Sequence, residues 1–314
     1  MLVSASLFAV FSLVSPTLAG TLPRFTDLVT FGDSYTDVQS ASDGGVAWPV
    51  YAAGQANVTL HAFARGGATC SSALTPRTGP PVMESQIPAF QNALKQSPLN
   101  QEQTVYTLWI GTNDVGVLGG LITGTAPQGV SVGNVTQCAV LSWMFALHDL
   151  GARNFIFMNM IPLELTPLYS PDGHPNRYWN HKRNATEWST SMRNLVTEGN
   201  SHSLFLLQLM AALLHDARIA LFDSHALFAD MYSNPRKYLN GTAPLNVTSS
   251  EQECDYEVEG GPVGGVCPPG AKGSDRDSFL WFDELHPSEQ ADRVVAREIA
   301  AAMRGNTTWA TWLF

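Results

Sequence analysis

The chain has 314 residues, 45% of them apolar, which is enough for one large domain with a substantial core. Its formal net charge is −10, from 17 Lys and Arg against 27 Asp and Glu. An acidic chain without a basic patch is poorly suited to nucleic acid or to an anionic membrane surface, because clustered Lys and Arg supply that attraction. We therefore expect neither kind of partner.

The N-terminus has the pattern of a secretory signal. Residues 1–19 carry no charge, and Thr17-Leu18-Ala19 offers a small-residue cleavage site. An uncleaved membrane anchor is the alternative, but Pro16 interrupts the helix that an anchor needs. We predict a signal peptide over residues 1–19 and one secreted domain over residues 20–314, in which no later apolar stretch is long enough to span a membrane.

Sequons and cysteines fit the same compartment. Six Asn-x-Ser/Thr sequons predict N-glycosylation, at Asn57, Asn134, Asn184, Asn240, Asn246 and Asn306. The four cysteines allow three pairings, and in an oxidising compartment disulfides are expected rather than free buried thiols. Cys254 and Cys267 share one Gly- and Pro-rich segment and are predicted to close a local loop, which leaves Cys70 to pair with Cys138.

Strand-like and helix-like segments alternate along the chain. Five short β-branched or aromatic runs suit strands buried on both faces, namely Asp27–Phe31, Asn57–Phe63, Thr104–Ile110, Asn154–Asn159 and Arg218–Asp223. Helices are expected at Glu84–Lys95, Val135–Leu150 and Trp188–Ala217, with a last helix starting at Pro287. The alternation predicts a three-layer α/β/α fold with a doubly wound, flavodoxin-like sheet of about five parallel strands.

One long segment interrupts this alternation. Residues 240–280 are rich in Gly, Pro and polar side chains and contain the predicted Cys254–Cys267 disulfide. We interpret the segment as a loop insertion rather than as a second domain. Because it directly precedes Asp283, it is expected at the rim of any site that uses this residue.

Small and polar residues follow the first three predicted strands. Ser34 comes after the first strand, Gly67 after the second and Asn113 after the third. In a doubly wound sheet ligands bind beyond the carboxyl ends of the strands, so these residues are expected to meet at one edge. The ordinary structural alternatives are a helix cap at Ser34, a turn glycine at Gly67 and a cap of the turn after the third strand at Asn113.

Asp283 and His286 form the single Asp-x-x-His pair of the chain. A serine hydroxyl needs a histidine base to attack an ester, and the base needs a carboxylate that holds its tautomer. Ser34, Asp283 and His286 supply these groups, and a spacing of three residues lets the last two meet across one helical turn. A capping role for His286 ahead of Pro287 is the alternative, and His225 is better explained as part of a helix start.

Four blocks in this order resemble the GDSL-type, or SGNH, hydrolases over almost all of the mature chain. They are Gly32-Asp33-Ser34-Tyr35, Arg65-Gly66-Gly67-Ala68, Gly111-Thr112-Asn113-Asp114 and Asp283-Glu284-Leu285-His286. The first block, with Tyr where Leu is usual, looks most like secreted fungal acetylesterases of carbohydrate esterase family sixteen. The resemblance implies an SGNH hydrolase fold and ester hydrolysis.

The same resemblance implies roles for individual residues. It places a nucleophile, an acid and a base at Ser34, Asp283 and His286. It places the donors of an oxyanion hole at Ser34, Gly67 and Asn113, or at Gly66 in place of Gly67 if the loop is shifted by one.

Aromatic residues near these blocks are candidates for binding substrate. Trp48, Trp109, Trp179 and Trp281 are candidates for stacking on sugar rings, although core packing is the more ordinary role of each. Trp281 is the best placed of them, two residues before Asp283. We expect Tyr35, Trp109 and Trp281 to bound a short acyl pocket.

Other chemistries lack their motifs. The sequence contains no His-Glu-x-x-His, Walker loop, Gly-x-Gly-x-x-Gly or Cys-x-x-Cys, so no metal and no cofactor is expected. The leading hypothesis is a secreted acetylesterase that deacetylates hemicellulose-derived oligosaccharides through an acyl-enzyme on Ser34. The alternatives are a GDSL-type lipase or phospholipase and a non-catalytic secreted binding glycoprotein. No protein partner is implied.

Overall fold

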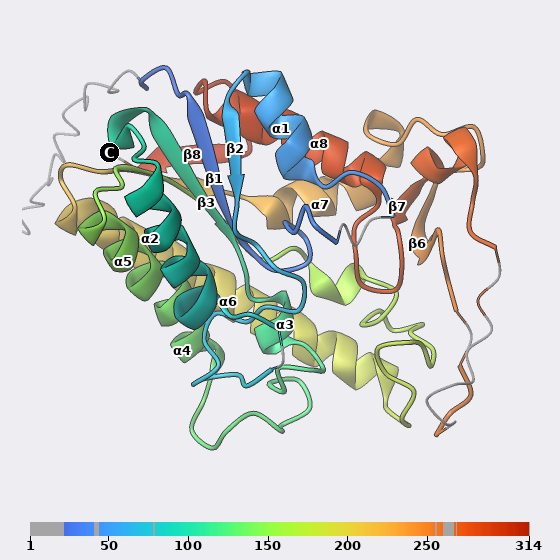
Figure 1. Cartoon of the computed structure of the whole chain (residues 1–314). Coiled ribbons are helices and arrows are strands. Elements are labelled where there is room, and N and C mark those ends of the chain that lie inside the picture. Colours follow the sequence, from blue (N-terminus) through green and yellow to red (C-terminus); the bar gives the residue numbers. More distant parts are fainter. Residues whose placement is uncertain are drawn as a thin grey trace, which may run out of the picture.

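The computed structural model describes residues 22–40, 44–77, 79–254, 256–259, 267 and 269–313. The predicted signal peptide lies outside the described residues. Figure 1 shows a central sheet between two layers of helices. Among the helices of these ranges, none has both the length and the apolar character needed to cross a membrane.

The main sheet has six strands in the order β2-β1-β3-β4-β5-β8. They are β1 (Asp27–Gly32), β2 (Thr59–Ala62), β3 (Thr104–Trp109), β4 (Asn154–Met158), β5 (Arg218–Phe222) and β8 (Ala310–Leu313). The first five are parallel, in the flavodoxin-like order, and each lies on one of the predicted runs, so the predicted fold class is confirmed. The sixth strand, β8, pairs antiparallel with β5 and was not predicted.

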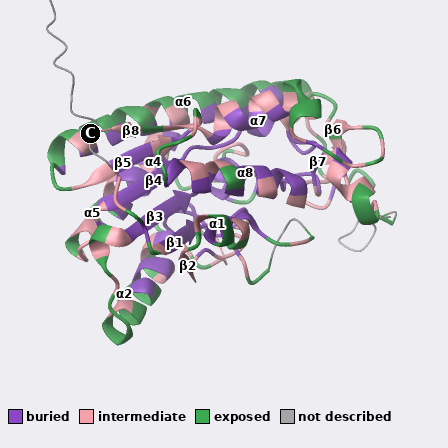
Figure 2. Ribbon diagram, turned by 90° about the horizontal axis from the view of Figure 1, so that it is seen from above, coloured by how far each residue is buried: buried purple, intermediate pink, exposed green. Residues whose placement is uncertain are grey.

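The two faces of the sheet are buried under different helices (Figure 2). One face packs against α1 (Trp48–Ala56), α7 (Ser224–Ser233) and α8 (Glu289–Ala302). The other face packs against α2 (Ile87–Gln96), α5 (Trp143–Asp149), the turn at Cys138–Ser142 that joins α5 to α4 (Val132–Gln137), and the C-terminal half of α6 (Ala185–Leu213). Neighbouring strand residues such as Leu28 and Val29 enter opposite cores, which is why the strand sequences are apolar at nearly every position.

Several helices differ in detail from the predicted segments. The first expected helix starts with a π-helical turn at Val82–Gln86 before α2, and another π-helical turn at Cys138–Ser142 joins α4 to α5. Short 3-10 helices occupy Gln101–Gln103, Leu163–Leu165, Pro235–Lys237 and Gly273–Ser278. The remaining helix is α3 (Thr112–Val115).

The expected start of the last helix at Pro287 is wrong. Helix α8 begins at Glu289, and its N-cap is Ser288, whose Oγ accepts a hydrogen bond from the Ala291 N–H at 3.2 Å. Pro287 instead forms a β-bridge with Trp281. This bridge closes the turn that carries Asp283 and His286, so the turn is a rigid connection rather than the first turn of a helix.

The segment interpreted as a loop insertion contains regular structure. Strand β6 (Asn246–Ser250) pairs in parallel with β7 (Phe279–Trp281) to form a second, two-stranded sheet. Both predicted disulfides are present, Cys70–Cys138 and Cys254–Cys267. The second disulfide ties the insertion to itself, close to the strand that leads to Asp283.

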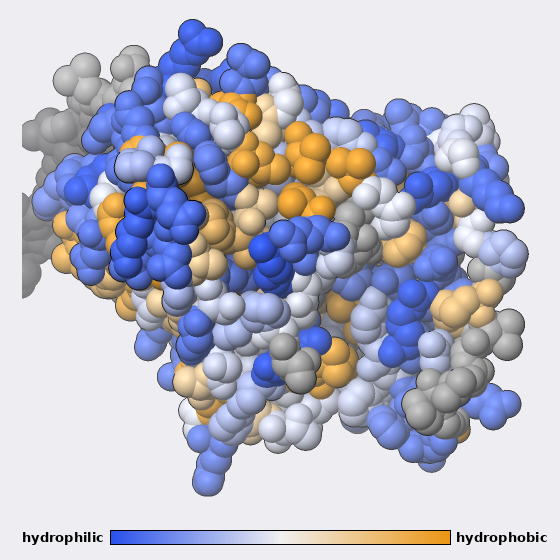
Figure 3. Space-filling view, in the orientation of Figure 1, coloured by the Kyte–Doolittle hydropathy of each residue, from blue (hydrophilic) through white to orange (hydrophobic). Residues whose placement is uncertain are grey.

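The surface is largely hydrophilic. Figure 3 shows apolar atoms gathered over α1, where Val50 and the preceding Val46 are exposed. None of the six sequon asparagines is buried, so the fold leaves each one accessible for the predicted glycosylation.

The central strand β3 provides a test of the core. Leu108 is fully buried there, and Leu108→Ala should lower the free energy of unfolding by about 2–5 kcal/mol through lost burial and a residual cavity. Leu213→Ala on α6 is the matched control, because this leucine is 55% exposed and its loss should change stability by about 0.5 kcal/mol or less. Urea denaturation measures both variants. Equal losses would contradict the described core.

Candidate active site

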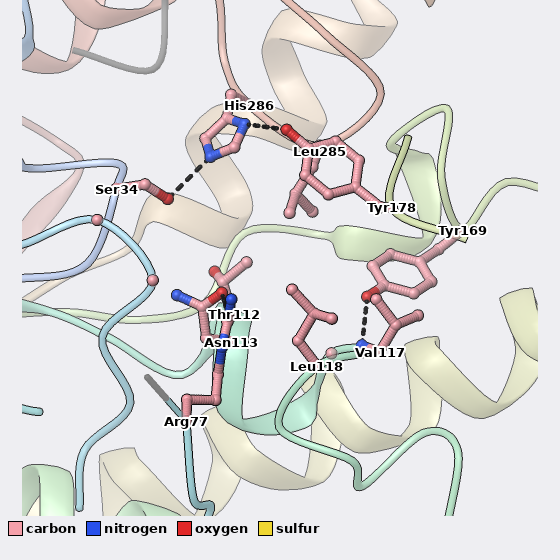
Figure 4. A pocket seen from close by; sticks show the side chains of 13 residues that line it. Ser34, Arg77, Thr112, Asn113, Val117, Leu118, Tyr169, Tyr178, Leu285 and His286 are labelled. Carbon is pink, nitrogen blue, oxygen red and sulfur yellow. Dashed lines mark hydrogen bonds between the residues drawn. The ribbon is translucent and has the colours of Figure 1, made fainter. Parts of the chain in front are cut away.

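Residues from five separate segments line one pocket of about 220 Å³ at the carboxyl edge of the sheet. The lining residues are Ser34, Gly66, Gly67, Arg77, Thr112, Asn113, Gly116, Val117, Leu118, Tyr169, Tyr178, Leu285 and His286. Figure 4 shows Ser34 and His286 on one side, with Thr112 and Asn113 across from Ser34. The sequence-predicted edge of parallel strand ends is therefore the place where Ser34, Gly67 and Asn113 meet.

Ser34, His286 and Asp283 form a continuous hydrogen-bonded chain. His286 Nε2 lies 2.8 Å from Ser34 Oγ, and His286 Nδ1 lies 3.0 Å from each carboxylate oxygen of Asp283. The acid and the base are nearly buried, at 4% and 8% exposure. One imidazole nitrogen thus faces the hydroxyl while the other is held by the carboxylate, which is the geometry that a serine nucleophile requires.

The turn after β7 positions Asp283 and His286. Asp283 Oδ1 accepts hydrogen bonds from the backbone N–H groups of Leu285 (2.9 Å) and His286 (2.7 Å), which folds the chain back on itself. Phe282 N–H donates to the His286 carbonyl at 2.8 Å and closes the turn. The two side chains meet as expected, but the expected helical turn between them is wrong, because an Asx-type turn brings them together.

Asp283 and His286 are both buried, and yet the charged form of each is stabilised by the other. Burial alone would raise the pKa of Asp283, but His286 and the hydrogen bonds from His286 and Tyr178 lower that pKa to about 2. Burial opposes the charged imidazolium, yet the Asp283 carboxylate outweighs this effect and raises the pKa of His286 above its ordinary value. Asp283 therefore remains an anion at any pH at which His286 is neutral.

A tight turn presents Ser34 at the end of β1. Gly32 has φ +145°, and a Cβ there would lie 2.3 Å from the Trp109 carbonyl oxygen of β3, so only glycine fits this close approach. Asp33 Oδ1 accepts from the Tyr35 N–H at 3.0 Å and holds the turn, and burial raises the pKa of Asp33 to about 7. Within the described residues, the backbone N–H of Ser34 donates no hydrogen bond.

The two candidate glycines differ in whether their N–H group is free. The Gly66 N–H donates to Asp37 Oδ2 at 2.8 Å and is therefore occupied. The Gly67 N–H makes no hydrogen bond to any residue that the structure describes, and its φ of +74° favours glycine. Of the two positions left open by the sequence, Gly67 is the one with a donor available to the pocket.

Asn113 is held at both ends of its amide group. Its Nδ2 donates to the Ala68 carbonyl at 2.9 Å, and its Oδ1 accepts from Arg77 Nη1. The second Nδ2 hydrogen has no partner within the described ranges. Because the Arg77 side chain contains only donors, the atom of Asn113 that it contacts must be the acceptor Oδ1, and the unused hydrogen therefore belongs to Nδ2.

The expected substrate-binding role of three aromatic residues is wrong. Tyr35, Trp109 and Trp281 are 3%, 2% and 0% exposed, and none lines the pocket. The Tyr35 hydroxyl donates to the Leu285 carbonyl at 2.7 Å, and the indole N–H of Trp109 donates to a backbone carbonyl. These side chains support the core behind the site and cannot reach a sugar ring.

The other two tryptophan candidates do not line the pocket either. Trp48 is the first residue of α1 and is fully buried, and Trp179 is half-buried against Trp188, with the ring centroids 5.1 Å apart. The structure therefore shows Trp48 and the other buried indoles in core packing, which is the more ordinary role of a tryptophan.

Sequence reasoning missed part of the pocket wall. Arg77, Leu118, Tyr169 and Tyr178 come from irregular segments after β2, β3 and β4. No periodic pattern or motif marks these segments, so only their folded position reveals them. In Figure 4 the tyrosines and Leu118 form the wall farther from Ser34.

No metal site accompanies this pocket in the part of the chain that is described. There, no group of three or more His, Cys, Asp or Glu side chains is arranged to hold a metal ion.

Comparison with known proteins identifies the family of this chain. A model of the GDSL-like lipase/acylhydrolase family matches residues 28–299. The chain belongs to this family. As a GDSL-like hydrolase it is a carboxylic ester hydrolase, which confirms the resemblance carried by the four sequence blocks.

Two fungal relatives of this GDSL-like hydrolase match it over most of their length. An acetylesterase of Hypocrea jecorina is 29% identical, over 92% of this chain and 91% of the relative. An acetylesterase of Thermothelomyces thermophilus is 25% identical, over 89% of this chain and 88% of the relative. Among solved structures, a GDSL-like lipase from Parabacteroides merdae has a TM-score of 0.43 at 12% identity, over 91% of this chain and 99% of that one.

The contact between Arg77 and Asn113 leads to a test in the GDSL-like hydrolase. If Asn113 is the oxyanion donor that the sequence predicts, Asn113→Ala should lower kcat by about 10²–10³, the usual cost of losing one such donor. Arg77→Met should cost less, and the double variant should be no worse than Asn113→Ala alone, because Arg77 acts by orienting that amide. Steady-state kinetics on p-nitrophenyl acetate measure all three. Fully multiplicative losses would show that Arg77 acts independently of Asn113.

Proposed function

We propose that this protein is a serine esterase that removes acetyl groups from acetylated carbohydrates, with Ser34 as the nucleophile. The observation that carries the proposal is the chain from Ser34 Oγ through His286 to Asp283, which opens into a pocket beside unused amide donors. A cap or a turn would need none of these contacts. Their convergence from segments about 250 residues apart is better explained by catalysis.

The residues present are sufficient for a two-step reaction. Ser34 Oγ attacks the ester carbonyl carbon as its proton passes to His286 Nε2, and the carbonyl oxygen becomes an oxyanion. His286 then returns the proton to the leaving alcohol, and the C–O bond breaks to give an acyl-enzyme. Water repeats the sequence, with His286 again as base, and releases the acid and the free serine.

Three donors are placed to stabilise the oxyanion. The Ser34 and Gly67 backbone N–H groups are unused among the described residues, and Asn113 keeps one amide hydrogen free. Donors that are fixed before the reaction stabilise developing charge without reorganising. Asn113 is fixed by Ala68 and Arg77, and Gly67 by its turn.

The substrate class rests on pocket size and on the named relatives. A pocket of about 220 Å³ suits a small acyl group with part of the alcohol. Both fungal relatives are called acetylesterases, and Tyr169 and Tyr178 place aromatic and polar groups on the wall where a sugar would lie. Hemicellulose-derived oligosaccharides are the substrate that the resemblance to carbohydrate esterase family sixteen favours.

One observation favours the lipase alternative. Leu118 is 54% exposed although it lines the pocket, and with Val117 and Leu285 it gives the pocket an apolar wall. An apolar rim of this kind can also accept an acyl chain. The length of the preferred acyl group therefore separates the two functions.

The proposal includes action outside the cell. Two disulfides link the described chain, and such bonds persist in oxidising compartments. The signal-like residues 1–19 and the accessible sequons agree with export. Detection of the glycosylated chain in culture medium, starting near residue 20, tests this part.

Hydrolysis of p-nitrophenyl acetate, butyrate and palmitate tests the proposed function. Acetate should be cleaved fastest and palmitate scarcely at all, since a small pocket rejects each added methylene by about 1–3 kcal/mol. Ser34→Ala should abolish turnover while leaving the unfolding transition unchanged. Preference for palmitate would establish the lipase alternative, and an inactive, correctly folded wild-type protein would establish the binding glycoprotein.

The charge state of His286 predicts the pH dependence. The base must be neutral to accept the serine proton, and Asp283 raises its pKa above the ordinary value of about 6.5. Activity should therefore be full at alkaline pH and should fall as the pH decreases through a midpoint above 6.5. A pH profile of kcat/KM on p-nitrophenyl acetate measures this limb. A midpoint well below 6.5 would contradict the described Asp283–His286 contact.

A further inference from the structure

We propose that Tyr178 is a positioning residue that holds the Asp283 carboxylate, and that the disulfide-linked insertion holds Tyr178 in turn. The inference deepens the proposed function and rests on it for its kinetic part. Tyr178 lies on the loop formed by residues 176–179, which we call the tyrosine loop. It is 105 residues from Asp283 in the chain, and no sequence motif marks it. Its role therefore appears only in the folded site (Figure 4).

The tyrosine hydroxyl completes the coordination of the carboxylate. It donates to Asp283 Oδ2 at 2.5 Å and lies 3.0 Å from His286 Nδ1. The turn itself provides two backbone donors, and both bind Oδ1. Within the described residues, Oδ2 is held by Tyr178 and His286 alone, so Tyr178 fixes the rotation of the carboxylate toward the imidazole.

Neighbouring residues hold the tyrosine backbone in place. Asn176 Oδ1 accepts the N–H groups of Tyr178 (3.0 Å) and Trp179 (3.2 Å), and Asn176 is almost fully buried. Arg177 points the other way, where its Nη2 donates to the Gln252 carbonyl at 2.8 Å and lies 2.9 Å from Cys254 Sγ. The loop is thus anchored on the insertion next to the Cys254–Cys267 disulfide.

The same insertion also holds the other side of the contact. Glu284, next to Asp283, is fully buried, and its Oε1 accepts the Cys254 N–H at 2.8 Å. Its Oε2 lies 2.9 Å from Arg177 Nε and forms an ion pair, although the two groups are not aligned as a hydrogen bond. Cys254 and Arg177 therefore fix the separation between the tyrosine loop and the turn that carries Asp283 and His286.

This contact has a chemical consequence for the base. A hydroxyl that donates to a carboxylate takes up part of its negative charge, so less of that charge stabilises the imidazolium. Three charged groups act on the pKa of His286. Asp283 lies in the same turn as His286, Asp33 lies in the turn after β1, and Arg177 lies in the tyrosine loop. All of these remain when only the Tyr178 hydroxyl is removed.

The test compares full-length wild-type protein with Tyr178→Phe. NMR titration of the His286 ring carbon, assigned by its absence in His286→Gln, should show a pKa higher in the variant by on the order of one pH unit. The acid limb of kcat/KM on p-nitrophenyl acetate should move to higher pH by the same amount, with a lower kcat. A lower kcat with an unmoved limb would reduce Tyr178 to a packing role and overturn the proposal.

Tyr169→Phe is the matched control. It removes a hydroxyl from the same pocket, but that hydroxyl accepts from the Val117 N–H at 3.1 Å and does not contact the triad. In this variant the acid limb of the kcat/KM profile and the pKa of His286 should therefore equal those of the wild-type protein. A shift equal to that of Tyr178→Phe would show that any lost pocket hydroxyl has this effect and would overturn the assignment.

A third variant tests the link to the insertion. The double substitution Cys254→Ser with Cys267→Ser loosens the anchor without changing a charge near His286, and it should shift the titration in the same direction by a smaller amount. If the pKa of His286 in this variant equals that in the wild-type protein, the role given to the insertion is overturned. If no acetyl ester is hydrolysed, the proposed function fails, while the NMR titration still decides the role of Tyr178.

Discussion

The site depends on keeping one buried carboxylate charged. Asp283 is 4% exposed, and an ion removed from water is stable only when donors surround it. Two backbone N–H groups, an imidazole and a tyrosine hydroxyl meet that need. Because each donor has a fixed origin, the carboxylate dictates the shape of the turn after β7, the rotation of His286 and the docking of the tyrosine loop.

The opposite wall of the pocket is organised around a second buried carboxylate. Asp114 accepts from the Cys70 N–H at 3.1 Å and from the Thr75 hydroxyl at 2.5 Å, which ties the segment after β2 to the segment after β3. The Cys70–Cys138 disulfide adds a covalent link to the helical layer. Burial raises the pKa of Asp114 to about 7, although the hydrogen bonds from Thr75 and Cys70 and the charge of Arg77 act to lower it. Gly67 and Asn113 are thus presented by a rigid double loop.

Because two separate walls form the pocket, many of its lining residues lie outside the four sequence blocks. The parallel sheet brings the ends of β1, β2 and β3 together, but it provides only one side of the pocket. The other side comes from α3 onward, from the tyrosine loop and from the turn before α8. Asp283, His286 and Tyr178 all lie on these irregular segments, so a small movement of one segment would change the contacts among the three side chains.

The sequence by itself determined the strands β1 to β5, because strands buried on both faces are apolar at nearly every position. It also determined the order of Ser34, Gly67, Asn113, Asp283 and His286, and the pairing of the cysteines. Tertiary structure decided the rest. Trp109 and Trp281 lie near the motifs in sequence yet point into the core, since neighbouring side chains on a strand face opposite ways. Arg77 and Tyr178 enter the site from irregular loops, and β8 pairs at the sheet edge, because such contacts depend on how distant segments pack and leave no periodic trace in the chain.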